Sequence, residues 1–467
     1  MSAGAVAERA PIEAPEIVFE RAHSSNPLVR WFGLLPKFDL MRAVETGPVC
    51  WTRLLGKRIY FVSDPEAIKH VLLDRVENYP KSVSYRNNLK PFLGTGLLVS
   101  EGDFWRRQRR LAQPAFHHKR LRLLVASMAE TAWRMVERWS RLPPGAAIDV
   151  MAEMNAVTME VVTRTMFGAD LTHEIAPVAQ AMTTLQDEVG SVRLSAFLEL
   201  PEWMLKPRSK RFREALGELD RVVNGLIAAR RSTDEERDDL LSMLISARDE
   251  QSGEGMTDRQ LRDEVMTIFL AGHETTALGL SWAFHLLGRH PEERVKLEVE
   301  VDDVLAGRQA AFEDLAKLSW TRMVGDEALR LFPPAYVFGR RAQAEDVVLG
   351  YRIPRGAHLM ISPYAMHRHP RYWDRPEAFR PERFTPEAAA ARPRYVYMPF
   401  GGGPRICIGN SFAQFEMQVI LAAIAARFRL DPIDPAAPVE AEPRITLRIK
   451  GGLPMRLTPR ASVRQAA

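Results

Sequence analysis

The chain has 467 residues, of which 46% are hydrophobic and 26% charged, and its formal net charge at pH 7 is +5. This composition predicts a globular protein with a large buried core, and it excludes a low-complexity chain dominated by glycine and proline. The two cysteines, Cys50 and Cys407, lie far apart in the sequence and do not indicate a disulfide framework. So few cysteines fit a reducing cytoplasm, and we expect Cys50 to pack in a strand.

The N-terminal residues are expected to form a flexible tail over residues 1–20, followed by a single domain over residues 21–467. The tail lacks the apolar core of a signal peptide. No stretch of the chain approaches the ~20 apolar residues that are needed to span a bilayer. We therefore expect a soluble, cytoplasmic protein without a membrane anchor.

The first half of the chain begins with a short β-region and then becomes mainly helical. A β-hairpin is expected from residues 49–55 and 58–62, and a helix opens at Pro65. From residue 101 to about residue 230 the pattern is mainly helical. Polar stretches at 231–239 and 251–255 indicate surface connections.

The clearest element is a long helix that starts after Thr257. Thr257 and Gln260 fit the capping box that opens helices. The helical pattern continues to His290-Pro291, which predicts about 32 residues and a length of roughly 48 Å. Its centre, residues 265–272, is apolar on nearly every side, so we expect this part of the helix to be buried.

The last third of the chain mixes short strands with one more helix. Strand patterns occur at residues 347–352 and 358–362, and a helix is expected from about residue 410 to residue 427. A proline-rich segment and hairpin-like strands follow it. The whole sequence predicts a mainly α fold with minor β structure.

The middle of the long helix contains the hexapeptide Ala271-Gly272-His273-Glu274-Thr275-Thr276. A zinc-protease helix is excluded, because Ala277 stands where its second histidine would be required. One interpretation is structural: Thr275 would bond back to the carbonyl of Ala271 and merely bend the helix. The other is functional, since a carboxylate and a hydroxyl lie side by side next to a pair of small residues.

Two charged motifs also allow a structural and a functional interpretation. Glu327 and Arg330 form an i,i+3 pair, and such a pair is usually a solvated contact worth ~0.2–0.5 kcal/mol. The apolar segment that follows, Leu331-Phe332-Pro333-Pro334, favours burial of this pair instead. Trp105 and Arg109 share one helix face within an arginine-rich run, which is often just a solvated surface. No known nucleic-acid-binding module surrounds this run, so nucleic-acid binding is not expected.

The segment from Phe400 to Gly409 places Cys407 in a glycine-rich loop just before a helix. A lone cysteine is most often buried and inert. Here, however, glycines allow close approach of the backbone, and the start of the next helix would stabilise a thiolate.

These motifs resemble those of the cytochrome P450 monooxygenases. The haem-ligand signature of that family, Phe-x-x-Gly-x-Arg-x-Cys-x-Gly, is matched by Phe400, Gly403, Arg405, Cys407 and Gly409. The resemblance extends over roughly residues 48–457, with its motifs in the family's order. It implies the cytochrome P450 fold, with a long central helix over the haem and small β-sheets, and haem b as the cofactor.

The resemblance also assigns roles to individual residues. Cys407 would be the proximal thiolate ligand of the haem iron. Thr275 would be the oxygen-stabilising hydroxyl and Glu274 the acid of a proton relay. The remaining implied haem-binding residues are Trp105, Arg109, Arg341, Phe400, Arg405 and Gly409. The implied structural network that locks the cysteine loop consists of Glu327, Arg330 and Arg383.

The implied reaction is the hydroxylation of a hydrophobic small molecule, such as a fatty acid, terpene, steroid or aromatic compound, with O2 and two electrons. The implied pocket residues, from segments without a fixed motif, are Tyr85, Phe92, Leu97, Phe269, Ala271, Tyr336 and Phe338. No flavin or iron–sulfur domain is expected in the chain, so electrons would come from a ferredoxin or flavodoxin and its reductase. The outer arginines of the 105–110 run and residues 117–120 would form a basic docking surface for that donor.

Two alternatives remain at this point. One is a peroxide-driven or isomerising haem-thiolate enzyme, which the paired Glu274 and Thr275 disfavour. The other is a non-catalytic haem sensor or carrier.

Overall fold

A computed structural model describes residues 11–17, 40–54, 56–168, 172–189, 208–232 and 239–460. The chain divides into two compact units, each of which is described by itself. The first unit comprises Met1–Val83, Ala335–Ala378 and Ala391–Cys407, and the second comprises Ser84–Pro334, Phe379–Ala390 and Ile408–Ala467. The expectation of a single domain therefore stays a prediction.

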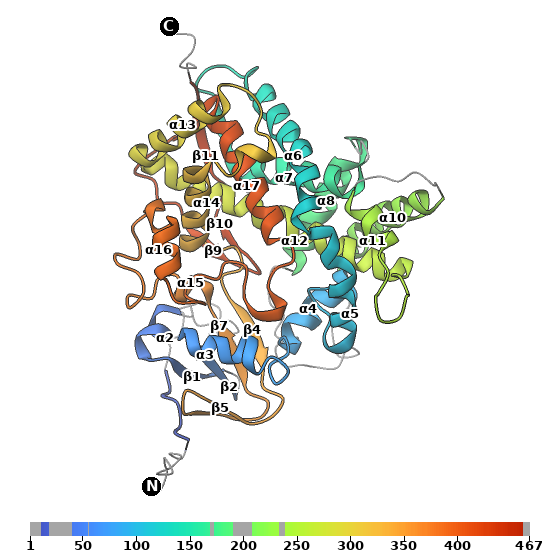
Figure 1. Cartoon of the computed structure of the whole chain (residues 1–467), viewed down its shortest axis with the longest axis vertical. Helices are drawn as coiled ribbons and strands as arrows, with labels where there is room; N and C mark the ends of the chain where they lie inside the picture. Colours follow the sequence, from blue (N-terminus) through green and yellow to red (C-terminus); the bar gives the residue numbers. More distant parts are fainter. Residues whose placement is uncertain are drawn as a thin grey trace, which may run out of the picture. The chain divides into compact units, whose positions relative to one another are not determined.

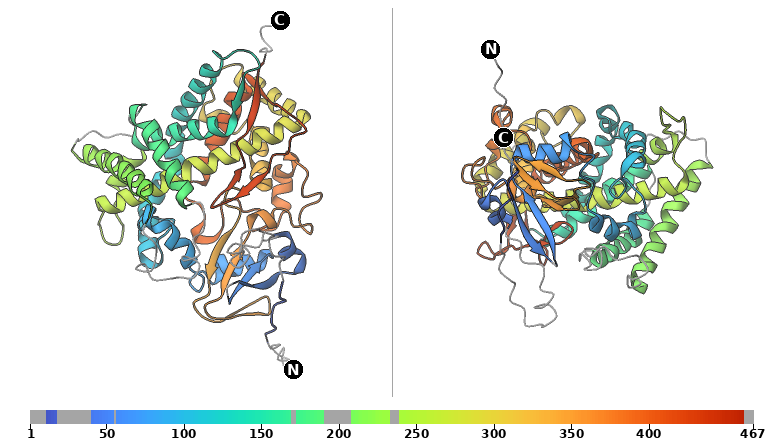
Figure 2. Two further views of the ribbon diagram at one scale, coloured as in Figure 1. Left: turned by 180° about the vertical axis from the view of Figure 1, so that it is seen from behind. Right: turned by 90° about the horizontal axis from the view of Figure 1, so that it is seen from below.

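The first unit is built on a four-stranded sheet with the strand order β1-β2-β7-β4. The strands are β1 (Val49–Leu54), β2 (Lys57–Val62), β7 (His358–Ile361) and β4 (Phe338–Arg341). Strands β1 and β2 form the expected antiparallel hairpin, and β2 pairs in parallel with β7, with Tyr60 opposite Leu359. The view from below shows the blue hairpin beside the orange strands from later in the chain (Figure 2).

Short elements surround this sheet. They are α2 (Leu40–Thr46), α3 (Pro65–Lys69), the π-helical turn η1 (His70–Asp74), β5 (Asp346–Val348), β6 (Tyr351–Ile353), α15 (Pro363–Met366) and the 3-10 turn η6 (Gly403–Arg405). Helix α3 begins at Pro65, as expected, because the Asp64 carboxylate accepts hydrogen bonds from the main-chain N–H groups of Glu66 and Ala67.

Part of the expected N-terminal tail packs on this unit. Ile12 pairs with Tyr351 and Glu16 pairs with Trp51 in isolated β-bridges. Ala14 is buried, and its carbonyl accepts a 2.9 Å hydrogen bond from the Trp51 indole. Residues 1–10 and 18–20 lie outside the described part of the chain.

The second unit is mainly helical, which confirms the predicted mainly α fold with minor β structure. Its helices are α4 (Val83–Leu93), α5 (Gly102–Ala112), η2 (Gln113–Phe116), α6 (His118–Trp139), α7 (Val150–Phe167), α8 (Thr172–Val189), α10 (Lys210–Arg231), α11 (Leu240–Ser246), α12 (Asp258–Arg289), α13 (Pro291–Leu305), η4 (Phe312–Asp314), α14 (Ser319–Leu331), η5 (Pro381–Phe384), α16 (Pro386–Ala391) and α17 (Asn410–Ala425). Its strands are β3 (Ala147–Asp149), β8 (Phe428–Pro432), β9 (Ala441–Pro443), β10 (Leu447–Ile449) and β11 (Pro454–Pro459). Among the helices described, none is both long enough and apolar enough to cross a bilayer.

Helix α12 is the predicted long helix, and its 32 residues match the expected length. The Thr257 hydroxyl accepts a hydrogen bond from the Gln260 N–H, and the Gln260 side chain accepts one from the Thr257 N–H, at 3.3 and 2.9 Å. The helix packs against α7, α14 and α17 (Figure 1). Most of its side chains are buried. An all-round apolar helix is stable only when its neighbours cover it in this way.

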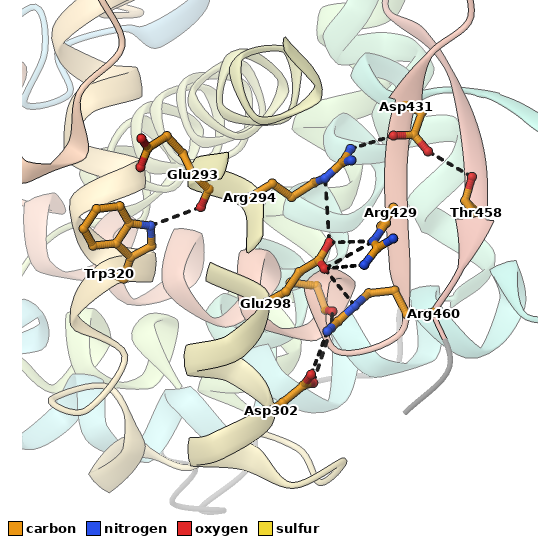
Figure 3. A network of polar contacts seen from close by, with 10 residues as sticks. Glu293, Arg294, Glu298, Asp302, Trp320, Arg429, Asp431, Thr458 and Arg460 are labelled. Carbon is orange, nitrogen blue, oxygen red and sulfur yellow. Dashed lines mark hydrogen bonds and ion pairs between the residues drawn. The ribbon is translucent and has the colours of Figure 1, made fainter. Parts of the chain in front are cut away.

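A network of charged side chains ties α13 to strands β8 and β11 (Figure 3). The Glu298 carboxylate is only 4% exposed, and it contacts Arg294 from its own helix, Arg429 from β8 and Arg460. Arg294 also binds Asp431 of β8, at 2.6 Å. Buried carboxylates of this kind require such pairing, because an isolated charge is costly to bury.

Candidate functional site

The cysteine loop belongs to the first unit, and its own main chain shapes it. The N–H of Cys407 donates to the carbonyl of Phe400 at 3.0 Å, and the N–H of Gly401 donates to that of Met398 at 3.0 Å. Cys407 itself is exposed. The exposed thiol is therefore carried by a loop whose main chain is hydrogen-bonded at Cys407 itself and at Gly401 before it.

Gly403 lies against the π-helical turn η1. Its φ is +66°, and a Cβ at this position would lie 2.0 Å from the carbonyl oxygen of Leu72. Only glycine fits such a contact, because any side chain would collide with another main chain. The signature glycine thus has a physical function here, which is to bring the cysteine loop against η1.

Arg405 is held by a second segment of the first unit. Its guanidinium donates to the carbonyl of Tyr79 at 3.1 Å, while the Tyr79 hydroxyl donates to Asp346 at 2.9 Å. Burial, assisted by the Asp346 carboxylate, raises the pKa of Tyr79, so its phenol remains a neutral donor. Arg341 is half-buried at the end of β4.

The other cysteine provides an internal contrast. Cys50 lies in β1, as expected, with its thiol 3.5 Å from the carbonyl of Ala43. Burial raises the pKa of the Cys50 thiol to about 12. Cys50 therefore stays protonated and buried, whereas Cys407 is exposed.

In the second unit, α5 carries the predicted tryptophan and arginine on one face. Trp105 is buried and Arg109 is half-buried. On the outer face, Arg110 binds Asp249 at 3.0 Å, and this hydrogen bond lowers the pKa of that carboxyl group. Arg107 donates to the carbonyl of Gly255 at 3.0 Å. Some of the arginines expected to dock a partner thus bind the neighbouring 249–255 connection.

The middle of α12 has one less buried stripe. Ile268, Gly272 and Thr275 are half-buried and Ala271 is exposed, while most of their neighbours are buried. Spacings of three and four residues place all four on one face of the helix. The Thr275 hydroxyl donates to the carbonyl of Ala271 at 2.6 Å, as the structural interpretation expects, yet the helix continues unbroken to Arg289.

Glu274 is 7% exposed and is paired with residues close to the C-terminus. The two Arg448 nitrogens lie 2.5 and 2.7 Å from its Oε1, and the Thr446 hydroxyl donates to the same oxygen at 3.2 Å. Nothing in the local sequence indicated these partners, because more than 170 positions separate them from Glu274.

A second carboxyl group beside α12 was also missed. Glu416 of α17 is fully buried, and neither of its carboxyl oxygens has a hydrogen-bond partner among the described residues. Burial raises the pKa of Glu416 well above its ordinary value, and the nearby Thr276 hydroxyl offsets only part of this rise. Burial therefore favours the neutral form of Glu416, which lies beside the residue that follows Thr275.

The structure brings together the three residues of the expected network. Glu327 and Arg330 are both 0% exposed, and two hydrogen bonds of 2.6 and 2.8 Å join their side chains. Arg383 approaches Glu327 at 3.4 Å, and the main-chain N–H of Arg380 donates to Glu327 at 2.9 Å. This pair is not the solvated surface contact that its spacing usually indicates.

The candidate pocket residues of the second unit have different environments. Phe269 is 4% exposed and its ring contacts that of His273, whereas Ala271 is exposed. The segment expected to be a loop before Trp105 contains helix α4, which includes Phe92 and continues past Pro91 to Leu93. The Tyr85 side chain lies outside the described part of the structure.

In the first unit, Tyr336 and Phe338 are half-buried. Phe338 packs on the core of that unit, and burial raises the pKa of the Tyr336 phenol to about 12. Phe338 therefore contributes to the core, whatever else it contacts.

The model of the family described as Cytochrome P450 matches residues 34–453 of this chain. The chain belongs to the cytochrome P450 family. Among similar proteins, a cyclooctatin synthase of Streptomyces melanosporofaciens is 37% identical over 88% of each chain. A cyclooctat-9-en-7-ol 5-monooxygenase of the same organism is 35% identical over 83% of each chain. The crystal structure of the cytochrome P450DA heme domain shares the fold, with a TM-score of 0.85, 24% identity, and coverage of 97% of this chain and 99% of that one.

The chain is thus a cytochrome P450 monooxygenase, and its family implies a haem with a cysteine thiolate ligand. The residues of the cysteine loop fit this cofactor. The thiol of Cys407 is exposed, Gly403 has no side chain that would disturb the loop, and Arg405 supplies a cation two positions away. A guanidinium is suited to bind a carboxylate such as a haem propionate.

Proposed function

We propose that this cytochrome P450 binds haem b through Cys407 and hydroxylates a hydrophobic, ring-containing small molecule. The observation that carries the proposal is the exposed Cys407 thiol in its glycine-dependent loop, in contrast to the buried Cys50 thiol. Trp105, Arg109, Arg341 and Arg405 are the proposed donors to the haem propionates. The ring-containing substrate class follows from the relative whose name specifies a cyclic unsaturated alcohol.

The haem, when bound, supplies the activation of dioxygen, and the residues of α12 supply positioning and protons. The Thr275 hydroxyl donates its proton to the Ala271 carbonyl, so its lone pairs can accept a hydrogen bond on the less buried stripe. Ala271 lies exposed on the same face, and its small methyl group leaves space there for a bound molecule. Glu274 is the proposed acid, and Arg448 and Thr446 hold its carboxylate in one orientation.

Electrons are proposed to come from a ferredoxin or flavodoxin and its reductase. Because Arg107 and Arg110 bind the 249–255 connection, the docking surface is assigned to the exposed residues His117, His118 and Lys119, together with Arg120. Salt should slow reduction if this docking is electrostatic. Lys119→Glu should slow it further, whereas Lys210→Glu on the exposed face of α10 should not. A reduction rate independent of salt would exclude this surface.

The test of the function is a visible spectrum of the ferric protein, followed by turnover. Cyclic alkenes and alcohols should convert the haem from low to high spin more strongly than fatty acids or steroids do. With a ferredoxin, its reductase and 18O2, one labelled oxygen atom should enter the product. Absence of a haem-thiolate spectrum would overturn the assignment of Cys407, and strong turnover with hydrogen peroxide alone would favour the peroxide-driven alternative.

The role of Thr275 is tested by Thr275→Ala, with Thr275→Ser as the control that keeps a hydroxyl. We expect product formed per electron pair to fall about tenfold or more in Thr275→Ala, with release of hydrogen peroxide. Thr275→Ser should retain most of the coupling. Equal coupling in all three proteins would leave Thr275 with only its hydrogen bond to Ala271.

A further inference from the structure

The segment between α4 and α5 is held by three consecutive charged residues near the start of α12, all within the second unit. The N–H and the hydroxyl of Thr95 donate to Asp263 at 2.8 and 3.1 Å. The N–H of Leu97 donates to Glu264 at 3.0 Å. Arg262 donates to the Asp263 carboxylate at 3.0 Å and so balances its charge. Two main-chain N–H groups of this segment, those of Thr95 and Leu97, are thus satisfied by carboxylates of a helix.

Arg262 extends this arrangement on both sides. It donates to the carbonyl of Phe92, the penultimate residue of α4, at 3.0 Å. It also binds Asp220 of α10 at 2.6 Å. The end of α4, the segment that follows it and α10 are therefore all fastened to one turn of α12.

The two carboxylates are deeply buried: Asp263 is 3% exposed and Glu264 is 2% exposed. Burying two adjacent carboxylates is unfavourable unless each is hydrogen-bonded or paired. Their main-chain donors come from the 92–97 segment. If the segment moved away, Asp263 and Glu264 would lose these donors, so the segment and the helix stabilise each other.

The segment is also shaped to lie this close. Gly94 has a φ of +58°, and a Cβ there would lie 2.2 Å from the Asp263 carboxylate. A Cβ on Gly96 would lie 2.1 Å from the Thr267 hydroxyl and 2.5 Å from the Asp263 carbonyl oxygen. Both glycines next to Thr95 are thus required for contact with α12, and the contact depends on residues from both sides.

Asp263 and Glu264, which bind the segment, lie close to the less buried stripe of α12. Glu264 precedes Ile268 by about one turn and Ala271 by about two turns, which is about 10 Å along the helix axis. Leu97, whose N–H is bonded to Glu264, and the adjacent Leu98 are both half-buried. Glu264, Ile268, Ala271 and Thr275 are spaced by three and four residues and so lie on one face of α12, which places the main chain of Leu97, bonded to Glu264, at the N-terminal end of that face.

We propose that Asp263 and Glu264 are positioning residues that determine substrate selectivity. They hold the Thr95–Leu98 segment as a fixed wall of the substrate site, an inference that rests on the proposed function. A fixed wall admits ligands whose shape already matches and excludes others, because it does not adapt to them. Breaking the contacts that hold the Thr95–Leu98 segment should widen the range of ligands that bind and weaken the binding of the preferred ligand.

The test uses variants that break the contact from each side. Asp263→Ala removes the acceptor, and Gly96→Ala introduces a methyl group against α12. Asp263→Asn is the conservative variant, since its amide oxygen can still accept from the Thr95 N–H. Gly217→Ala in α10 is the matched control, because a Cβ there meets nothing within 4 Å.

The first measurement is hydrogen exchange of the haem-loaded protein in peptides covering residues 93–100. Exchange should be about tenfold faster or more in Asp263→Ala and Gly96→Ala, intermediate in Asp263→Asn, and unchanged in Gly217→Ala. If Asp263→Ala does not fold, Gly96→Ala and Asp263→Asn still give the comparison. Unchanged exchange in both disruptive variants would overturn the proposal.

The second measurement is the spin-state titration with a panel of cyclic alcohols, fatty acids and steroids. The preferred ligand should bind about tenfold more weakly to the released variants, and the ratio between the best and worst ligands should shrink. Faster exchange with an unchanged ratio would overturn the selectivity role. A wild-type protein without a haem-thiolate spectrum would overturn the proposed function and this role with it, while the exchange data would still show whether the contact holds the segment.

Discussion

The loop that carries Cys407 and helix α12 are held in different ways. In the first unit, main-chain contacts hold the loop: Cys407 bonds to Phe400, and Gly403 lies against Leu72. In the second unit, charged side chains hold the groups of α12: Glu274 is paired with Arg448, and Asp263 binds the Thr95 main chain.

The difference has a physical basis. The loop from Phe400 to Gly409 is fixed within ten residues by main-chain hydrogen bonds and by the close contact of Gly403. A carboxylate inside a buried helix must be paired or hydrogen-bonded, which requires partners from other elements. The loop should therefore be sensitive to substitutions that add side-chain volume, and α12 should be sensitive to substitutions that remove a charged partner.

The largest effect is expected from added volume in the loop. Gly403→Ala should abolish haem incorporation, because its Cβ would lie 2.0 Å from the Leu72 carbonyl oxygen. Gly401→Ala is the matched control: its φ is +74°, but a Cβ there meets nothing within 4 Å. It should cost only about 1–2 kcal/mol and keep haem. Haem content of the purified proteins measures both, and equal haem loading of the two variants would show that the Leu72 contact is unimportant.

The next largest effect is expected from Arg330→Ala. It leaves Glu327, which is 0% exposed, without its main cation, and should cost about 3–5 kcal/mol of unfolding free energy. Lys450→Ala, which breaks the exposed pair with Glu440, should leave the unfolding free energy almost unchanged. Denaturant unfolding of both proteins gives the comparison. A stable Arg330→Ala protein would mean that Arg383 and the Arg380 N–H are enough to stabilise the buried Glu327 carboxylate.

A moderate effect on coupling is expected from Arg448→Ala. Glu274 would lose the cation that holds its carboxylate, so product formed per electron pair should fall about threefold to tenfold. Arg448→Lys should restore part of the loss. The double-mutant cycle is decisive: in a Glu274→Gln background, Arg448→Ala should have little further effect. Additive losses would separate Arg448 from the function of Glu274.

The smallest effect near pH 5 is expected from Glu416→Gln, and it should grow as the pH rises. Because the pKa of Glu416 is raised in the folded protein, the folded state keeps a proton that the unfolded state releases above about pH 4.5. The stability of the wild type should therefore fall as pH rises above this value, by up to about 1.4 kcal/mol per pH unit from this group. Glutamine mimics the neutral acid and should flatten this dependence.

Thermal unfolding between about pH 5 and pH 8 measures the difference. Glu345→Gln serves as a control, since Glu345 is exposed and its pKa is lowered by its hydrogen bond with Arg352. Parallel curves for the wild type and Glu416→Gln would show that Glu416 is ionised in the folded protein.

Local patterns predicted much of the fold. The capping box of Thr257 and Gln260 located the start of α12, and the β1–β2 hairpin and the Pro65 helix were also found. These elements depend on residues that lie within a few positions of one another. The segment before Trp105 was expected to be a loop, but it contains helix α4, which continues past Pro91. A proline inside a helix is locally unfavourable, so the helix forms here because tertiary packing overrides the local propensity.

Long-range partners could not be predicted in this way. The contacts of Glu274 with Arg448, of Asp263 with Thr95 and of Arg405 with Tyr79 each join residues more than 150 positions apart. None of them follows from spacing within a helix or strand. The buried, neutral state of Glu416 also depends on packing that surrounds α17 from several elements.

The sequence by itself determined the family, the mainly α fold and the choice of the cysteine in the glycine-rich loop as the candidate haem ligand. Each of these rests on a contiguous motif or a local periodicity. Only the tertiary structure decided which cysteine is exposed, which carboxyl groups are paired and which segment is fastened to α12. Burial and pairing are properties of the space around a side chain, and residues from distant parts of the chain fill that space.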